Sequence, residues 1–219
     1  MNRKTITEEY YVLVVDKNGA ISSIRSNELN SGLIASGLMD LMMDGVITIE
    51  KNKITVVKDL PEGLKHLKSL YTYLTEKNRT TEKVMGDYVM SMGARMREFI
   101  GEIGETLVAE GLAEKGKGGL FGPKVTYIPV KNYKDQLIEA VKDIVKTEDE
   151  FSPRDMAFLC ILQETHNLNQ YFSKYESQEI KDKLKEIKKN PQNKQLAEMV
   201  NYVNSMTAVI AALTVTTTV

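Results

Sequence analysis

Residues 95–127 have the sequence RMREFIGEIGETLVAEGLAEKGKGGLFGPKVTY. The first half predicts an amphipathic helix that ends at Gly111, because its apolar residues recur at helical spacing. This stripe consists of Met96, Ile100, Ile103 and Leu107. The second half predicts a hairpin, since glycines at 116, 118, 119 and 122 suit a tight reversal and β-prone residues return at 125–130.

The expected tip of this hairpin carries an apolar pair among basic residues. Leu120 and Phe121 occupy the tip, and the flanking lysines are Lys115, Lys117 and Lys124. Insertion of the pair into a bilayer, with the lysines near anionic lipid, would support reversible membrane binding. The pair could instead fold back on the body of the protein or pack against another subunit in a homo-oligomer. The pattern leaves both interpretations open.

The length of the chain, 219 residues, allows one sizeable core or two small subdomains. Hydrophobic residues make up 42% and charged residues 27%, a balance typical of globular proteins rather than disordered ones. No linker-like segment is long enough to divide the chain into two domains. We therefore expect a single domain over residues 1–219, with residues 1–7 poorly ordered.

The charge balance limits the class of partner. The 29 basic residues nearly cancel the 30 acidic ones, so an anionic partner must be met by a local patch. The single cysteine, Cys160, excludes an intrachain disulfide and fits a reducing compartment. The N-terminus has no apolar signal region, and the weakly polar run at 206–219 is shorter than the roughly 20 residues of a membrane span. These features predict a cytoplasmic protein, peripheral at the inner membrane face.

The N-terminal region predicts a first hairpin. Residues 9–15 are rich in Tyr and Val, and a second β-prone run covers 20–24. An Asn-Gly pair at 18–19 lies between them, which is a strong hairpin signal.

A helix and a second hairpin follow. Ser26 or Asn27 is the expected N-cap of this helix, and Gly45 is the expected stop. Residues 46–49 and 54–57 then predict two strands joined by a short turn. A helix followed directly by a hairpin is also the outline of a winged-helix unit.

The remaining chain predicts mostly helices. Their expected ranges are 64–78, 80–90, 137–145, 152–162, 179–189 and 194–213. Ser152 is a good N-cap, because Pro153 follows at the first helical position and Asp155 lies in the first turn. The fold class is therefore mainly α: a single globular helical domain with short peripheral β-hairpins.

Enzymatic and metal-binding patterns are missing from the sequence. His66, on an expected charged helix surface, and His166 are not at ligand spacing from each other or from other ligating residues. Cys160 falls in an apolar helix, where a buried inert thiol is the common case. No nucleophile elbow, phosphate-binding loop or dinucleotide fingerprint is present. We expect no catalytic residue, no metal and no cofactor.

Two arginines on the helix of residues 95–111 are candidates for an anion site. Guanidinium groups bind phosphate through paired donors, so Arg95 and Arg97 could hold a phosphorylated group. Local ion pairs with Glu98 or Glu102 are the alternative.

The order of these features resembles the Golgi phosphoprotein 3 family. The similarity covers nearly the whole chain from about Glu8 and rests on pattern and order. The segments that carry it are EEYYVLVVD at 8–16, SGL at 31–33, LMDL at 38–41, DGVI at 44–47, LVAEGL at 107–112 and RDMAFL at 154–159.

The resemblance implies a helical domain whose apolar hairpin enters the membrane. It also implies a basic pocket beside the hairpin for the head group of phosphatidylinositol 4-phosphate. The family's pocket tryptophan falls at Arg25, and its arginines fall at Ile34, Arg97 and Ile100. Arg97 is thus the matching position, and Arg25 could supply a displaced charge. With Arg95 added from the helix pattern, the expected head-group residues are Arg25, Arg97 and Arg95, with no role in catalysis.

Two functions follow as hypotheses. The first is a non-enzymatic peripheral protein that binds anionic lipid, including phosphoinositides, through the hairpin and a partial basic pocket. The alternative is a winged-helix-like nucleic-acid-binding regulator, with Lys51 and Lys53 on one wing and Lys115 and Lys117 on the other. The near-zero net charge argues against it, as does an expected recognition helix at 29–43 without Lys or Arg.

Overall fold

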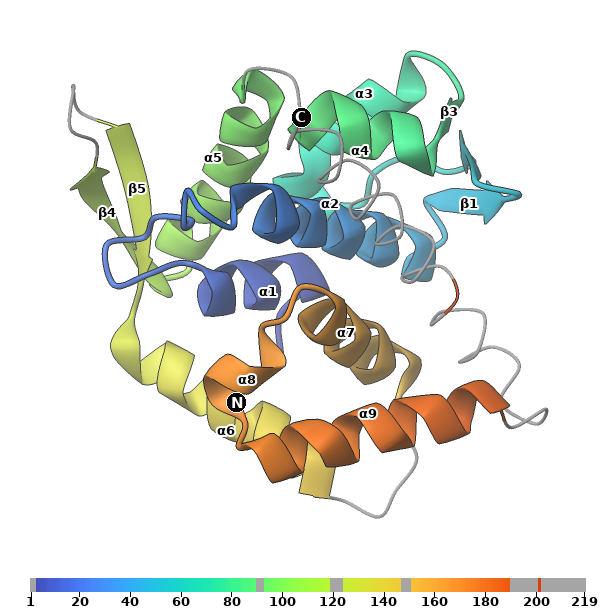
Figure 1. Ribbon diagram of the computed structural model, residues 1–219. Coiled ribbons are helices and arrows are strands. Elements are labelled where there is room, and N and C mark those ends of the chain that lie inside the picture. Colours follow the sequence, from blue (N-terminus) through green and yellow to red (C-terminus); the bar gives the residue numbers. More distant parts are fainter. Residues whose placement is uncertain (1–2, 90–92, 119–123, 147–150, 190–200, 202–219) are drawn as a thin grey trace, which may run out of the picture.

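The computed structural model describes residues 3–89, 93–118, 124–146, 151–189 and 201. The predicted fold class is confirmed, since helices form the body of the described chain and strands occur only in two small antiparallel sheets. One sheet lies at one end of helix α2 and the hairpin β4–β5 lies beyond the other end (Figure 1). No helix in these ranges is long and apolar enough to cross a bilayer.

Helix α1 (Ile6–Val14) replaces the first arm of the predicted N-terminal hairpin. The prediction of a strand at 9–15 was wrong, and only an isolated bridge between Val15 and Ile21 remains of the pairing. Thr5 and Glu8 form a capping box, which starts the helix by bonding its first amide groups. All nine residues of α1 are buried, so its β-prone tyrosines and valines fill the core from every side.

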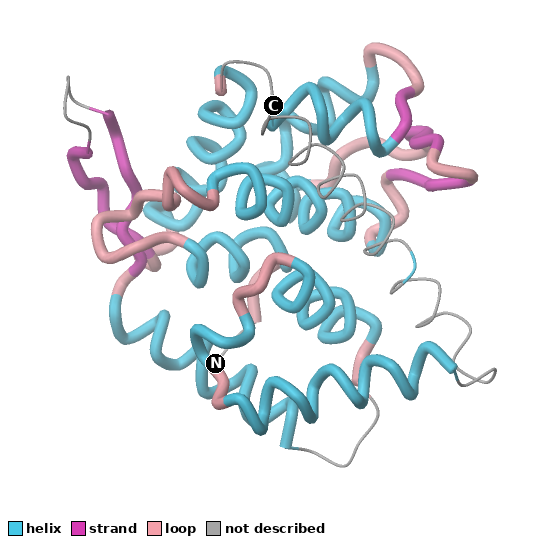
Figure 2. The backbone as a smooth tube through the Cα atoms, in the orientation of Figure 1, coloured by secondary structure: helices cyan, strands magenta, loops and turns pink. Residues whose placement is uncertain are grey.

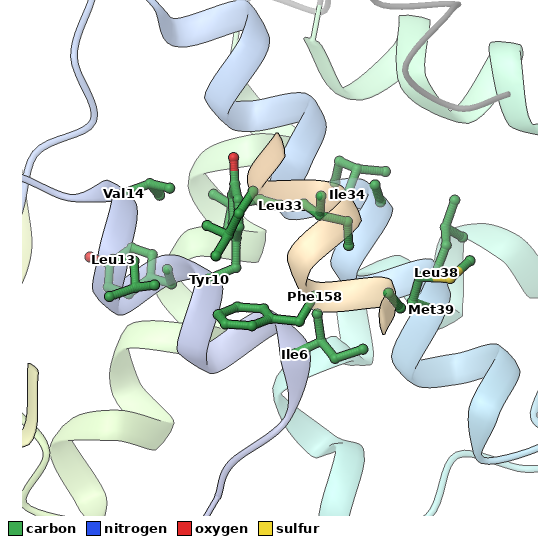
Figure 3. Close-up of a cluster of buried hydrophobic side chains, with 14 of the residues drawn as sticks. Ile6, Tyr10, Leu13, Val14, Leu33, Ile34, Leu38, Met39 and Phe158 are labelled. Carbon is green, nitrogen blue, oxygen red and sulfur yellow. The ribbon is translucent and has the colours of Figure 1, made fainter. Parts of the chain in front are cut away.

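Helix α2 (Ser26–Met43) crosses the centre of the molecule and is buried without interruption from Ser31 to Leu41. Its end at Gly45 is confirmed, because this glycine has φ +68° after the last turn. Gly32 permits the close approach of α1: a Cβ atom there would lie 2.1 Å from the hydroxyl oxygen of Tyr10. Figure 3 shows Ile6 and Tyr10 of α1 packed with Leu33 of α2 and Phe158 of α7 (Pro153–Glu164).

The second predicted hairpin is confirmed as strands β1 (Ile47–Glu50) and β2 (Lys53–Val56). Lys51 and Asn52 have positive φ values of 48° and 66°, as a two-residue hairpin turn requires. Strand β3 (Arg79–Thr80) completes the sheet in the order β1-β2-β3. The helical segments nearby are η1 (Glu62–Leu67), α3 (Lys68–Thr75) and α4 (Thr81–Val89).

The predicted helix and hairpin of residues 95–127 form helix α5 (Ala94–Ala109) and strands β4 (Ala113–Gly118) and β5 (Lys124–Pro129). The predicted helix and the predicted return arm are both confirmed, and Gly111 ends the helix with φ +71°. The two strands pair antiparallel from Ala113 with Pro129 to Gly118 with Lys124. The expected tip, with Leu120 and Phe121, lies outside the described residues.

The C-terminal helices lie on the side of α1 that faces away from α4 and α5, below α1 and α2 in Figures 1 and 2. They are α6 (Lys131–Lys146), α7, α8 (Leu168–Tyr171) and α9 (Lys174–Lys189). Ser152 caps α7 as predicted, because its side chain accepts a hydrogen bond from the Asp155 amide. The helix expected at 194–213 lies outside the described residues except for residue 201.

Candidate functional site

A pocket of about 610 Å³ lies beside the hairpin β4–β5. Its walls come from β5, from the ends of α4 and α5 that face each other, and from the segment 19–30 that leads into α2. We call it the hairpin pocket. Figure 1 shows the same arrangement, with the loop between α1 and α2 running beside β5. The pocket therefore combines elements that are far apart in the sequence.

Tyr127 joins these walls. Its ring lies against α5 at Gly104, where an added Cβ atom would be 2.1 Å from Cγ of the ring. Its hydroxyl donates to Oε1 of Glu105 at 2.9 Å, and its carbonyl oxygen accepts from the Tyr11 hydroxyl at 3.0 Å. Burial and this carboxylate together raise the pKa of Tyr127 to about 12. The phenol therefore stays neutral and keeps its hydrogen bond.

A second close approach holds the loop before α2 against the same tyrosine. A Cβ atom on Gly19 would lie 2.4 Å from the carbonyl oxygen of Tyr127, and Gly19 has φ +70°. Only glycine meets both conditions without strain. Sequence reasoning missed Tyr127, although an isolated glycine inside a helix, here Gly104, often marks a close packing contact.

Arg97 supplies the positive charge of the hairpin pocket. Its side chain is solvent-exposed on the first turns of α5, and among the described lining residues it is the charged one. The N-terminal ends of α2 and α5 also reach the lining, at Ser26 and Gly93. Because helix N-termini carry partial positive charge, this wall favours an anion.

Two buried polar atoms in the pocket have no hydrogen-bond partner among the described residues. They are Oδ1 of Asn30 on α2 and Oγ1 of Thr126 on β5. Thr126 pairs with Gly116 across the hairpin, and a Cβ atom on that glycine would lie 2.7 Å from the Thr126 hydroxyl. A buried polar atom without a partner costs free energy, so both atoms suit a ligand with hydroxyl or phosphate groups. Sequence periodicity gave no signal for either residue.

The three predicted arginines do not share one pocket. Arg95 projects from α5 to a different pocket, where its guanidinium carbon lies 4.9 Å from the ring centroid of Tyr73. Arg25 donates to both carboxylate oxygens of Glu28 and, at 2.5 Å, to the carbonyl oxygen of Thr165. Glu28 raises the pKa of Arg25 further. Of the three, Arg97 is the one that lines the hairpin pocket.

The predicted membrane-contacting residues are only partly described. Nζ of Lys115 lies 2.8 Å from Oε1 of Glu105, and this ion pair lowers the pKa of the Glu105 carboxyl. Lys117 is exposed on β4. The side chains of Leu120, Phe121 and Lys124 lie outside the described residues.

His66, His166 and Cys160 do not come together as a cluster in the described structure. His66 was expected on a helix surface, but it is 2% exposed and its Nε2 lies 3.0 Å from Oγ1 of Thr5. Burial and the nearby Lys4 lower the pKa of His66 to about 4, so the ring is neutral at physiological pH. Cys160 is buried. The described residues contain no group of three or more His, Cys, Asp or Glu placed to hold a metal ion.

The winged-helix interpretation conflicts with the position of α2. A recognition helix must offer one face to a nucleic-acid groove, whereas α2 is buried from Ser31 to Leu41. The two proposed wings also lie beyond opposite ends of α2 (Figure 1). This packing argues against groove reading by that helix.

The comparisons with known proteins agree with the order of elements. The family model for Golgi phosphoprotein 3 (GPP34) matches residues 6–203, which include every helix and strand described above. No curated protein matches the chain. Because the family match spans most of its length, the chain belongs to the Golgi phosphoprotein 3 family.

Proposed function

We infer that the protein is a non-enzymatic peripheral membrane protein that binds anionic lipid through the hairpin pocket and the hairpin tip. In this proposal Arg97 contacts the head-group phosphate, and Leu120 and Phe121 enter the bilayer. Membership of the Golgi phosphoprotein 3 family supports lipid binding in general. The observation that carries the proposal for this chain is the hairpin pocket itself. It contains one guanidinium and two polar atoms that have no hydrogen-bond partner in the described part of the chain.

The energetics favour reversible binding. Burying an apolar side chain such as leucine or phenylalanine contributes about 1.5–3 kcal/mol, and each lysine near an anionic surface adds about 1 kcal/mol. Lys115 contributes less than a lysine without an acidic neighbour, because its ammonium group is already paired with Glu105. Two inserted side chains and a few charges are a weak anchor compared with a membrane-spanning helix. A specific head-group contact at Arg97 would then decide which membrane is bound.

Vesicle flotation tests the proposal. Wild-type protein should float with vesicles of phosphatidylcholine and phosphatidylglycerol, and remain unbound with phosphatidylcholine alone. The double variant Leu120→Asp, Phe121→Asp should lose this binding. Full binding by the double variant would show that the hairpin tip serves another purpose, such as contact between subunits, and would overturn the proposal.

Arg97→Ala tests the pocket separately, with Arg95→Ala as a matched control on the same helix. We expect Arg97→Ala to weaken binding by on the order of 10-fold, because a charge-assisted contact to phosphate is lost. Arg95→Ala should bind like wild type, since that side chain faces the other pocket. Parallel vesicles with phosphatidylinositol 4-phosphate in place of phosphatidylglycerol decide whether the head group is a phosphoinositide. Equal binding by Arg97→Ala and wild type on both would remove the pocket from the proposal.

A further inference from the structure

Ile24 is the most exposed large hydrophobic side chain among the described residues, at 95%. It lies in the turn that precedes α2, between Ser23 and Arg25. A single exposed isoleucine needs no explanation by itself. The position of Ile24 does need an explanation, because Ser23 and Ser26 on either side of it both line the hairpin pocket.

A second exposed hydrophobic residue lies on another wall of the same pocket. Val125 of β5 is 54% exposed and also lines it. The loop of Ile24 and the strand of Val125 are fixed to one another through the contact of Gly19 with the Tyr127 backbone. The pocket is therefore flanked by exposed apolar side chains on two different elements.

The charge of this region indicates what kind of surface covers it. The described lining of the hairpin pocket contains Arg97 and no acidic side chain. A partner must then combine negative charge at the pocket with an apolar phase beside it. A phospholipid bilayer with anionic head groups has this combination, since head groups and acyl chains adjoin at the interface.

We propose that Ile24 is a second membrane anchor, which inserts into the bilayer when the head group enters the hairpin pocket. This proposal rests on the proposed function, because it assigns one more contact to the same membrane-binding face. Insertion at two elements would also orient the pocket toward the bilayer, since a single hairpin leaves the body free to rotate about its tip.

The chain contains no tryptophan, so a single introduced tryptophan reports its own surroundings. We would compare Ile24→Trp with Val57→Trp, which replaces another exposed hydrophobic residue, 57% exposed and next to strand β2 at the other end of α2. With phosphatidylcholine–phosphatidylglycerol vesicles, Ile24→Trp should show a blue-shifted emission and quenching by brominated lipid. Val57→Trp should show neither change.

Binding of unlabelled variants gives the second readout. Ile24→Ser should reduce vesicle affinity by on the order of 10-fold, because one fully exposed side chain no longer transfers into the bilayer. A near-native circular dichroism spectrum is expected, since the side chain makes little contact with the core. Wild-type affinity in Ile24→Ser, together with an unshifted Ile24→Trp emission, would overturn the anchor.

The controls separate this result from the proposed function. If the double variant at Leu120 and Phe121 loses binding, while Ile24→Ser binds as wild type and Ile24→Trp emission stays unshifted, the hairpin alone inserts and the anchor is wrong. If wild-type protein does not bind the vesicles at all, the proposed function and the anchor both fail.

Discussion

Thr126 shows how one side chain can connect stability with ligand binding. It is only 6% exposed, and its hydroxyl has no hydrogen-bond partner among the described residues. Within the described residues, folding therefore buries this hydroxyl without a hydrogen-bond partner to compensate its desolvation. A ligand in the hairpin pocket would supply the missing partner, so the residue would cost stability in the free protein and contribute affinity in the complex.

Thr126→Val tests both effects of this hydroxyl, on stability and on ligand binding, because valine keeps the shape of the side chain and removes the hydroxyl. We expect the free energy of unfolding to stay equal or rise by up to about 1–2 kcal/mol, and vesicle binding to weaken. Urea unfolding and vesicle flotation measure the two effects. Thr81→Val is the matched control: Thr81 is 1% exposed and its hydroxyl has no partner within the described ranges, but it lies outside the hairpin pocket. A similar loss of lipid binding in both variants would show that the Thr126 hydroxyl does not contact the ligand.

The sequence predicted Arg97 as a binding residue but could not predict Thr126 or Asn30. A charged side chain on a helix surface stands out from the residue type alone. An unpartnered hydroxyl depends on which groups surround it after folding, and those groups come from other elements. Arg25 and Arg95 show the same limit, since Glu28 and Tyr73 decide where their guanidinium groups lie.

At the level of elements, helix α1 shows why a strand prediction failed. Tyrosine and valine favour strands because they suit a half-buried pleated surface. Here the whole segment is buried, so packing overrides this preference, and no amphipathic stripe is needed. The sequence did contain a helix signal: Thr5 and Glu8 have the spacing of a capping box immediately before the apolar run.

The close contact between the hairpin and α5 can also be tested. Gly104→Ala would place a methyl group inside the Tyr127 ring, so Tyr127 or the hairpin must move. We expect a loss of about 1–3 kcal/mol in the free energy of unfolding, as for other overpacked sites. Chemical denaturation measures it.

Gly86→Ala is the control for helix propensity. Gly86 lies within α4, and no atom lies within 4 Å of an added Cβ. That change should leave stability unchanged or raise it by up to about 1 kcal/mol. Equal destabilisation by the two substitutions would contradict the close contact at Gly104.

On the scale of the whole molecule, a buried polar cluster fastens the N-terminus to the core. Glu9 is fully buried and pairs with Arg3 at 2.7 Å and Arg154 at 2.8 Å. Asp40 of α2 accepts hydrogen bonds from the backbone amides of Ile6 and Thr7, at 2.9 and 2.8 Å. Burial raises the pKa of Asp40 to about 6. Sequence patterns did not indicate this cluster, because its members come from three separate segments: residues 3–9, α2 and α7.

His66 borders this cluster and makes stability depend on pH. Its folded-state pKa is about 4, below the unfolded value of 6.5, so protonation favours the unfolded chain. The neutral His66 ring therefore contributes roughly 3 kcal/mol to the free energy of unfolding above pH 6.5. This contribution is lost as the pH falls toward 4. Asp40 has the opposite sign: its raised pKa adds stability as the pH falls through 6 toward 3.8. The two trends therefore partly cancel in the wild-type protein.

His66→Gln isolates the contribution of His66 to the pH dependence of stability. Wild type and variant should differ in their pH dependence, with wild type losing roughly 3 kcal/mol relative to the variant between pH 7 and pH 4. Urea unfolding at several pH values measures this difference. His166→Gln is the control, because that ring is 80% exposed and its pairing with Glu28 contributes little. Parallel pH profiles of wild type and His66→Gln would exclude a titrating His66.

Most of the element order was readable from the sequence, but the assembly was not. Apolar spacing and glycine stops located α2 and α5, the Ser152 cap located α7, and β-prone runs with turn signals located both strand pairs. The expected cap of α2 at Ser26 or Asn27 was wrong, because the N-cap is Arg25 and its side chain makes no capping hydrogen bond. The hairpin pocket, in contrast, exists because α1, α5, β5 and the loop before α2 meet at one tyrosine. Such a junction depends on contacts between distant segments, which single-sequence periodicity does not encode.

The Tyr127 junction has a consequence for the kinetics of membrane association. Its contacts hold the pocket walls together within the free chain, with no bound lipid needed to assemble them. Ordering of loops would therefore add little to the entropy cost of binding. The speed of association would be set by encounter with the charged surface, and the residence time by how deeply the apolar side chains are held.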